Sequence, residues 1–238
     1  MKFFFLFFVC FSPLFSQGTA YFIPPKGWKE IDPNSLTPFV QMGYVGKGAS
    51  SFAPSINIAE ESVGTISQKE YLDIVKKLHT ANPSTSWRRL GPLQTKIGKA
   101  ELTEITIQNS GSKIKMLQCI FLRDGQAHII TGASDGTEFG KFRKIFTSVF
   151  RSFNVTTDLV RELKDPTREQ KIGQYFTHLT SLLQKATVSE KEKKANVLDF
   201  HAYLTNECPE QGSYWHYLVL KELERKVRPP QSAISSLK

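Results

Sequence analysis

Histidine and cysteine, the side chains that most often hold metals or act as nucleophiles, are few in this chain of 238 residues. No two histidines have the His-Glu-x-x-His spacing of zinc hydrolases, in which both histidines lie on one helix face and bind the ion. His201, Cys208 and His216 are close in sequence, but their separations match none of the common zinc patterns. The sequence therefore predicts no metal and no other cofactor.

Motifs for nucleophilic catalysis and phosphate binding are also missing. Neither Cys119 nor Cys208 lies in a recognisable nucleophile motif, and the chain lacks the Gly-x-Ser-x-Gly elbow of serine hydrolases. The glycines of "GYVGKG", residues 43–48, fit neither the dinucleotide-binding nor the phosphate-loop spacing, and no helix start follows them. We therefore predict that the protein is not an enzyme. A hydrolase with an unrecognised site is one alternative.

One short segment has the composition of an interaction site. Trp87, Arg88 and Arg89 lie in "STSWRRLGP", residues 84–92, and Trp and Arg are enriched among residues that dominate binding energies. The segment follows an Asn-Pro pair that ends a predicted helix, so we expect it in a loop, where binding residues concentrate. These three residues are the predicted binding site. In the alternative interpretation, Trp87 covers the edge of a sheet and the two arginines are simply solvated.

The first 20 residues have the pattern of a secretory signal peptide. An early lysine precedes an apolar run from Phe3 to Phe15, and Gly18 and Ala20 occupy the small-residue positions before a cleavage site at Tyr21. The run is shorter than the roughly 18 apolar residues of a membrane span, and no later segment reaches that length. We predict export, cleavage near Ala20, and a mature protein that is soluble in the periplasm or secreted.

The formal net charge of +9 favours partners that carry negative charge. Most of the basic excess lies in residues 21–155. Export makes nucleic acid an unsuitable partner, so we predict none. A protein partner is the main prediction, and an anionic membrane surface is the alternative. The sequence does not indicate the oligomeric state.

Residues 39–135 contain the β-strand signals. Two extended pieces flank the glycine-rich turn, and "KAELTEITIQ", "SKIKMLQCIFLRD" and "QAHIITGAS" follow with short turns between them. The Asp124-Gly125 pair between two apolar runs is a strong hairpin signal. Residues 114–122 are apolar on both faces, which predicts a central strand covered on each side. Between the two groups of strands, a capping box at "SQKE", residues 67–70, predicts the start of a helix.

The clearest helical pattern is "TEFGKFRKIFTSVFRSF", residues 137–153. Five phenylalanines, with Ile145 and Val149, recur at helical spacing, and basic residues occupy the other side. A cationic amphipathic helix of this kind either lies on a membrane or packs on a sheet. Because a sheet with an uncovered face is predicted immediately upstream, we expect the phenylalanine stripe to pack on it.

From Thr156 onward the strand pattern ends and helical spacing takes over. Capping signals at residues 167–170 and 189–192 predict two helices, and a third is predicted after the break at Pro209 and Gly212. We therefore predict a helical domain at residues 156–228 and a disordered tail at 229–238. The two mature cysteines then belong to different domains, and whether they are paired is left open.

Several features, taken in order, resemble the PsbP-like family: the "PKGW" opening, then "PSINIAEE", a capped helix, three strands, and a phenylalanine-rich helix that ends at Ser152-Phe153. The resemblance covers about residues 22–155. It implies an α+β domain, residues 21–155, in which helices sandwich an antiparallel sheet, a fold shared with small Ran-binding proteins. The small all-α region follows it. The resemblance also implies a non-enzymatic accessory or adaptor role, in which the protein binds another protein or an envelope assembly.

Overall fold

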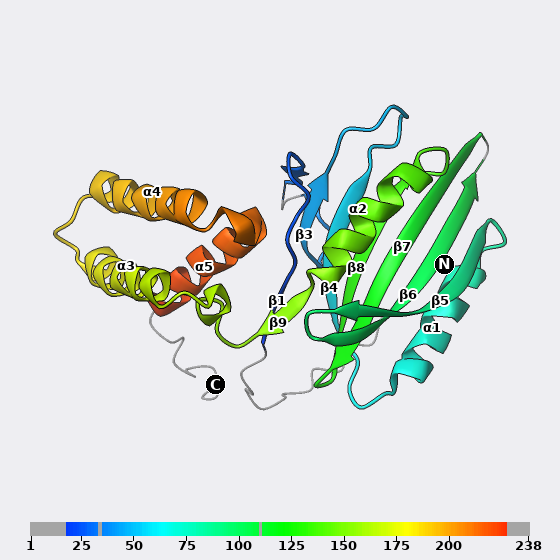
Figure 1. Ribbon diagram of the computed structural model, residues 1–238, viewed down its shortest axis with the longest axis horizontal. Helices are drawn as coiled ribbons and strands as arrows, with labels where there is room; N and C mark the ends of the chain where they lie inside the picture. The colour runs from blue at the N-terminus through cyan, green and yellow to red at the C-terminus, as the bar shows by residue number, and fades with distance from the viewer. Residues whose placement is uncertain (1–17, 33–34, 110, 228–238) are drawn as a thin grey trace, which may run out of the picture.

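The computed structural model describes residues 18–32, 35–109 and 111–227 (Figure 1). Its main element is a seven-stranded antiparallel sheet with the strand order β2-β3-β4-β8-β7-β6-β5. The strands are β2 (Lys29–Glu30), β3 (Val40–Val45), β4 (Ser55–Ser62), β5 (Thr85–Thr95), β6 (Gly98–Asn109), β7 (Ser112–Arg123) and β8 (Gln126–Asp135). Helices lie on both faces of this sheet. The predicted α+β class, an antiparallel sheet between helices followed by an all-α region, is confirmed.

Helix α2 (Phe139–Arg151) packs on one face of the sheet through the predicted phenylalanine stripe. Phe142, Phe146 and Phe150 are buried, and burial of each such ring contributes about 1.5–3 kcal/mol before the loss of conformational entropy. The sheet makes room for the helix at Gly132, where an added Cβ atom would overlap the ring of Phe146. The expectation that this helix covers the sheet is therefore confirmed.

Helix α1 (Gln68–Thr80) lies on the opposite face, behind the sheet in Figure 1. The predicted capping box is present: Ser67 Oγ accepts from the Glu70 amide at 3.2 Å, and Glu70 Oε2 accepts from the Ser67 amide at 2.8 Å. Tyr71 and Leu72 form an apolar cluster with Ile120 of β7. Strand β7 is therefore covered on both faces, as its apolar sequence predicts.

The prediction that residues 84–92 form a loop is wrong, because most of them belong to the edge strand β5. This strand pairs with β6 from Thr85 to Thr95. The loop-like composition is explained by the edge position: Pro92 has no N–H to donate, which an edge strand tolerates. Gly91 has a φ of +101° at a shift in the β5–β6 register, where a positive φ accommodates a bulge.

Three helices follow the sheet, as predicted: α3 (Pro166–Gln184), α4 (Glu190–Glu207) and α5 (Gly212–Val227). Single 3-10 turns precede α3 and α5, η2 (Arg161–Leu163) and η3 (Pro209–Gln211). The predicted capping box at residues 167–170 is wrong. Asp165 is the N-cap of α3, and its carboxylate accepts from the amides of Thr167 and Arg168 at 3.0 and 3.1 Å. Pro166 occupies the first helical position, where its missing N–H is not needed.

The first described residues pair with the strand that follows α2. Strands β1 (Thr19–Tyr21) and β9 (Asn154–Thr156) form a separate two-stranded sheet, and the predicted domain boundary at 155–156 falls within β9. The predicted leader lies outside the described residues except for positions 18–20, and the predicted tail at 229–238 lies outside them entirely. Over the described ranges, no helix combines the length and apolarity needed to cross a bilayer.

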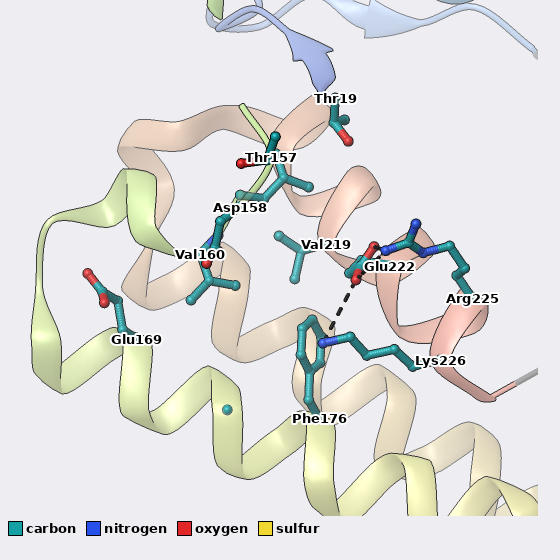
Figure 2. A pocket seen from close by; sticks show the side chains of 12 residues that line it. Thr19, Thr157, Asp158, Val160, Glu169, Phe176, Val219, Glu222, Arg225 and Lys226 are labelled. Atoms are coloured by element: carbon teal, nitrogen blue, oxygen red, sulfur yellow. Dashed lines mark hydrogen bonds and ion pairs between the residues drawn. The ribbon is translucent and has the colours of Figure 1, made fainter. Parts of the chain in front are cut away.

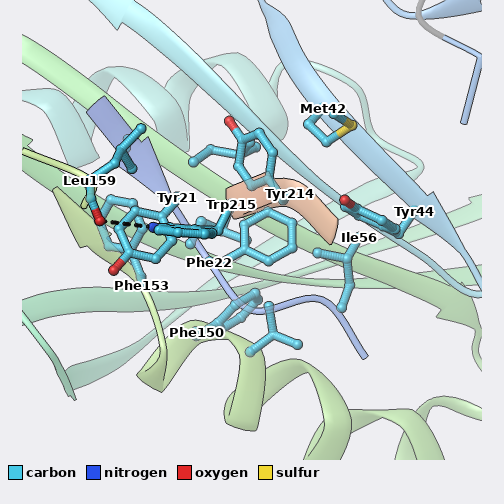
Figure 3. Packing of buried hydrophobic residues seen from close by; sticks show 14 of the residues in the cluster. Tyr21, Phe22, Met42, Tyr44, Ile56, Phe150, Phe153, Leu159, Tyr214 and Trp215 are labelled. Carbon is cyan, nitrogen blue, oxygen red and sulfur yellow. Dashed lines mark hydrogen bonds between the residues drawn. The ribbon is translucent and has the colours of Figure 1, made fainter. Parts of the chain in front are cut away.

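An aromatic cluster joins the three C-terminal helices to the sheet (Figure 3). We call its members the aromatic junction: Tyr21, Phe22, Tyr44, Tyr214 and Trp215, each exposed by 2% or less. The Phe22 ring lies 5.9 Å from the Tyr44 ring and 5.4 Å from the Tyr214 ring, measured between centroids. The apolar core is therefore continuous from the sheet into the helices.

Candidate functional site

The three predicted binding residues are neighbours on β5 but point to different faces of the sheet. Trp87 and Arg89 face the α1 side and Arg88 faces the other, because side chains alternate along a strand. Arg88 donates to Glu104 Oε1 at 3.0 Å, and Arg89 donates to the two oxygens of Glu101 at 2.7 and 2.8 Å. Both arginines are thus paired with β6. The structure does not bring the three side chains together, and their role in binding stays a prediction.

Trp87 is half-buried against the apolar cluster formed by α1, β7 and β8. This position fits the alternative interpretation, in which the indole covers the sheet edge. Its Nε1 is buried and has no hydrogen-bond partner among the described residues. The side chain therefore contributes apolar contact area here rather than a polar interaction.

The histidine and cysteine side chains of the C-terminal region do not converge on a metal position. His216 Nε2 lies 2.9 Å from the Cys208 carbonyl oxygen, so this nitrogen carries the proton, and His201 is exposed. Burial lowers the pKa of His216, which keeps the ring neutral at pH 7. Cys208 and Cys119 are both buried and free. In the part of the chain that the structure describes, no group of three or more His, Cys, Asp or Glu side chains could hold a metal ion.

A hollow lies between α3 and α5, beside the link from β9 (Figure 2). Its volume is about 420 Å³, which is in the range of ligand pockets. Its lining combines apolar side chains with charged ones: Leu159, Val160, Phe176 and Val219 with Asp158, Glu169, Glu222, Arg225 and Lys226. These residues come from the segment after β9 and from two helices, so the hollow exists only when the C-terminal region is folded.

A second hollow, of about 600 Å³, continues the first along α3 and shares Phe176 and Lys226 with it. We call the two together the α3–α5 groove. From Glu169 to Gln184 it follows α3 over about 22 Å, at 1.5 Å per residue. The α3 residues that line it are Glu169, Gly173, Phe176, Thr177, Thr180, Ser181 and Gln184.

Small side chains on α3 leave the space that forms this groove. Ile172 and Leu179 are fully buried in the core, and the neighbouring face carries mostly glycine, serine and threonine. A Cβ atom added to Gly173 would meet no atom within 4 Å. None of these residues was among the predicted site residues, although small residues at spacings of three and four along α3 are visible in the sequence.

The charges of the groove are unevenly paired. Lys226 Nζ lies 4.5 Å from the centroid of the Phe176 ring and 3.8 Å from Glu222 Oε1. Arg225 lies 2.9 Å from the other oxygen of Glu222. Glu222 is thus balanced by two cations, whereas Glu169 forms no ion pair with any described residue. Lys226 covers the ring where the two hollows meet, so a bound segment would have to displace it.

The lining of the groove has the composition of a binding surface. The Phe176 ring lies in both hollows, with charged and hydroxyl side chains around it. An apolar ring with polar groups along the edges is typical of grooves that accept an amphipathic segment of another protein. The α3–α5 groove is therefore the best candidate site.

The sheet, its two covering helices and the helical C-terminal region define an α+β protein. No family model matches the chain, and no curated protein matches it in sequence. Several solved structures resemble it over part of its length.

Cyanobacterial PsbP (CyanoP) from Synechocystis sp. PCC 6803 is 15% identical, with 61% of this chain and 96% of that chain covered and a TM-score of 0.42. LpqN of Mycobacterium tuberculosis, which is involved in cell envelope biogenesis, is 13% identical over 58% of this chain and 85% of its own, with a TM-score of 0.45. The Ran-binding protein Mog1p of Saccharomyces cerevisiae is 13% identical over 58% of this chain and 96% of its own, with a TM-score of 0.39.

These structures include both groups that the sequence resemblance names, PsbP and the Ran-binding proteins. The expected architecture, an antiparallel sheet between helices, is the one that the structure has. With identities of 15% or less and TM-scores below 0.5, these likenesses carry no argument about function.

Proposed function

We propose that the protein is an exported, non-enzymatic accessory protein that binds a segment of another protein in the α3–α5 groove. The observation that carries the proposal is the groove itself, two adjoining hollows of about 420 and 600 Å³. A length of about 22 Å matches some 15 residues of helix or six to seven residues of extended chain. This is the size of a peptide segment. Export is supported by the leader pattern of residues 1–20.

The lining of the groove defines the chemistry of the segment. An apolar side chain would pack on Phe176 and Val219, in the space that Gly173 leaves open. The unpaired carboxylate of Glu169 at one end favours a basic side chain, and Lys185 at the other end favours an acidic one. We therefore infer an amphipathic segment that carries opposite charges at its two ends.

Filling the groove at Gly173 is expected to abolish binding of the partner without unfolding the protein. Gly173→Trp directs an indole into the groove, because a Cβ atom at this position meets nothing within 4 Å. Gly173→Ala is the matched control: it should raise the free energy of unfolding by about 1 kcal/mol and leave binding intact. The measurement is affinity capture from the cell envelope fraction with quantitative mass spectrometry, together with thermal melting of each variant.

A protein captured by the wild type and by Gly173→Ala, but not by Gly173→Trp, would be the partner of the groove. Equal capture by all three proteins would contradict the proposal. A variant with alanine at Trp87, Arg88 and Arg89 tests the predicted β5 site in the same experiment. If this variant alone loses the partner, the binding site is on β5.

A second candidate function, binding to an anionic membrane surface, is favoured by the outer face of α2. Arg143, Lys144 and Arg151 are exposed there, and none of them forms an ion pair with a described residue. Together with Thr147 and Ser148 they border a hollow of about 360 Å³. Unpaired arginine and lysine side chains on one helix face attract lipid phosphate groups.

Replacing Arg143, Lys144 and Arg151 by glutamine is expected to weaken binding to anionic vesicles about 100-fold, because each cation near the surface contributes about fivefold. Co-sedimentation with vesicles containing anionic phospholipid measures this, with vesicles of neutral lipid as a reference. Glutamine at Lys191, Lys193 and Lys194 on α4 removes the same charge elsewhere and serves as the control. Absent binding by the wild type, or equal losses in both variants, would exclude α2 as a membrane-binding face.

A further inference from the structure

A cavity beside the exposed part of α1 has the features of a ligand site. Tyr71, Ile74 and Leu78 form one apolar stripe on this helix. Tyr71 is buried, but Ile74 is 47% and Leu78 71% exposed. The apolar stripe therefore extends beyond the part of the helix that the sheet covers. A cavity of about 140 Å³ lies between this stripe and Ile120 and Ile129 of the sheet. We call it the α1 cavity.

The sheet presents unpartnered polar atoms on the same side. Gln118, which lines the cavity, donates through Nε2 to Thr131 Oγ1 at 3.2 Å, while its buried Oε1 has no partner among the described residues. Thr103 Oγ1, directly opposite Gln118 on β6, and Trp87 Nε1 are also buried and unpartnered. Buried polar atoms are nearly always hydrogen-bonded in folded proteins. Of these three residues Gln118 lines the cavity, so an occupant that donates a hydrogen bond to its Oε1 would satisfy this atom.

The other polar groups of the lining indicate that this occupant is neutral. Among the described residues that line the cavity, Glu61 is the only carboxylate, and its Oε2 already accepts from Tyr71 Oη at 2.8 Å. Burial lowers the pKa of His79, so its ring is uncharged near pH 7. Apart from Gln118, the rest of the described lining is apolar: Ile74, Val75, Leu78, Ile120 and Ile129. The site is therefore suited to binding.

We propose that the α1 cavity binds a neutral aromatic ring that carries one hydrogen-bond donor, as in a phenol. The volume of about 140 Å³ is close to that of aliphatic cavities of roughly 150 Å³ that bind benzene. The phenol hydroxyl would donate to Gln118 Oε1, and the ring would lie against Ile74, Ile120 and Ile129. The same chemistry comes from a free phenolic compound or from a tyrosine side chain of a peptide. The site is distinct from the α3–α5 groove, which lies at the other end of the molecule (Figure 1).

The test compares ligands that differ in a single group. In ¹H–¹⁵N NMR titrations of the protein, p-cresol is expected to shift the signals of α1 and of the Gln118 side-chain amide. Toluene has the same ring and methyl group but no hydroxyl, and we expect it to bind about fivefold more weakly. Gln118→Leu should remove this preference for p-cresol. A tripeptide with a central tyrosine and blocked ends, titrated in parallel, distinguishes the two sources by its affinity relative to p-cresol.

Two leucine variants serve as controls for the α1 cavity. Leu78→Asn, at its exposed rim, should weaken the binding of both p-cresol and toluene. Leu198→Asn changes another exposed leucine, 56% accessible on α4, and should leave both affinities unchanged. The proposal would be overturned by equal affinity for p-cresol and toluene, by an absence of shifts at α1, or by an unchanged preference in the Gln118→Leu protein.

Discussion

Replacing Phe146 by aspartate is expected to unfold the protein. The side chain is fully buried between α2 and the sheet, with ring centroids 6.2 to 6.4 Å from those of Phe139, Phe142 and Trp28. Loss of a buried phenylalanine costs about 3–5 kcal/mol, and an unpaired carboxylate in its place adds several more. The sum is comparable with the whole free energy of unfolding of a typical domain, about 5–15 kcal/mol.

Circular dichroism and thermal melting measure the effect of this substitution. Lys144→Asp is the matched control, because it introduces the same side chain on the exposed face of the same helix, and its melting temperature should stay close to that of the wild type. A Phe146→Asp protein that melts cooperatively at the wild-type temperature would show that α2 does not contribute to the core.

Replacing Trp215 by alanine is expected to release the helices from the sheet. Trp215 is fully buried, and its Nε1 donates to the Leu159 carbonyl oxygen at 3.1 Å. Truncation costs about 3–5 kcal/mol, and the carbonyl left without a donor adds about 1–3 kcal/mol. Because the lost contacts lie at the aromatic junction, α3 to α5 should become sensitive to proteases while the sheet and α2 remain folded. Urea unfolding combined with limited proteolysis measures both effects.

Trp87→Ala is the control for this truncation. It removes the same side chain from a half-buried position that lacks a hydrogen bond, so the loss of stability should be smaller. If the two variants lose the same stability, or if residues 166–227 stay protected in the Trp215→Ala protein, the aromatic junction is not what holds the helices in place.

The sheet and its covering helices could be predicted because local and long-range signals agree there. Asp124 and Gly125 both have positive φ, 50° and 75°, and they set the β7–β8 hairpin that their sequence predicts. The phenylalanine stripe of α2 follows a sheet with an open face, and it packs on that face. In both cases residues close in sequence decide the structure.

The sequence of residues 84–92 does not predict strand β5, because the pairing that makes this segment a strand is with β6. Pro92, Gly91 and the serines at its start are typical of loops, and an edge strand tolerates them since only one of its sides is paired. What makes the segment a strand is its ladder with β6, including the pairs of Arg88 with Glu104 and of Arg89 with Glu101. Composition within residues 84–92 does not contain that information.

The α3–α5 groove and the aromatic junction depend on the placement of whole helices. The spacing of Tyr214 and Trp215 predicts a buried helix face but does not say which surface covers it. The structure shows that the cover is Phe22 and Tyr44, which lie far upstream in the chain. The groove likewise forms only where α3 and α5 leave a gap beside Gly173, and a single helix pattern does not reveal gaps between helices.

The contact between Tyr44 and α5 also bears on how the chain is made. Tyr44 Oη and Ser213 Oγ are 3.0 Å apart although 169 residues separate them in sequence. At a translation rate of about 5–20 residues per second, roughly 10–30 s pass between the synthesis of the two partners. During that interval the early aromatic side chains lack the helix that covers them, so a nascent chain cannot finish folding on the ribosome before α5 emerges.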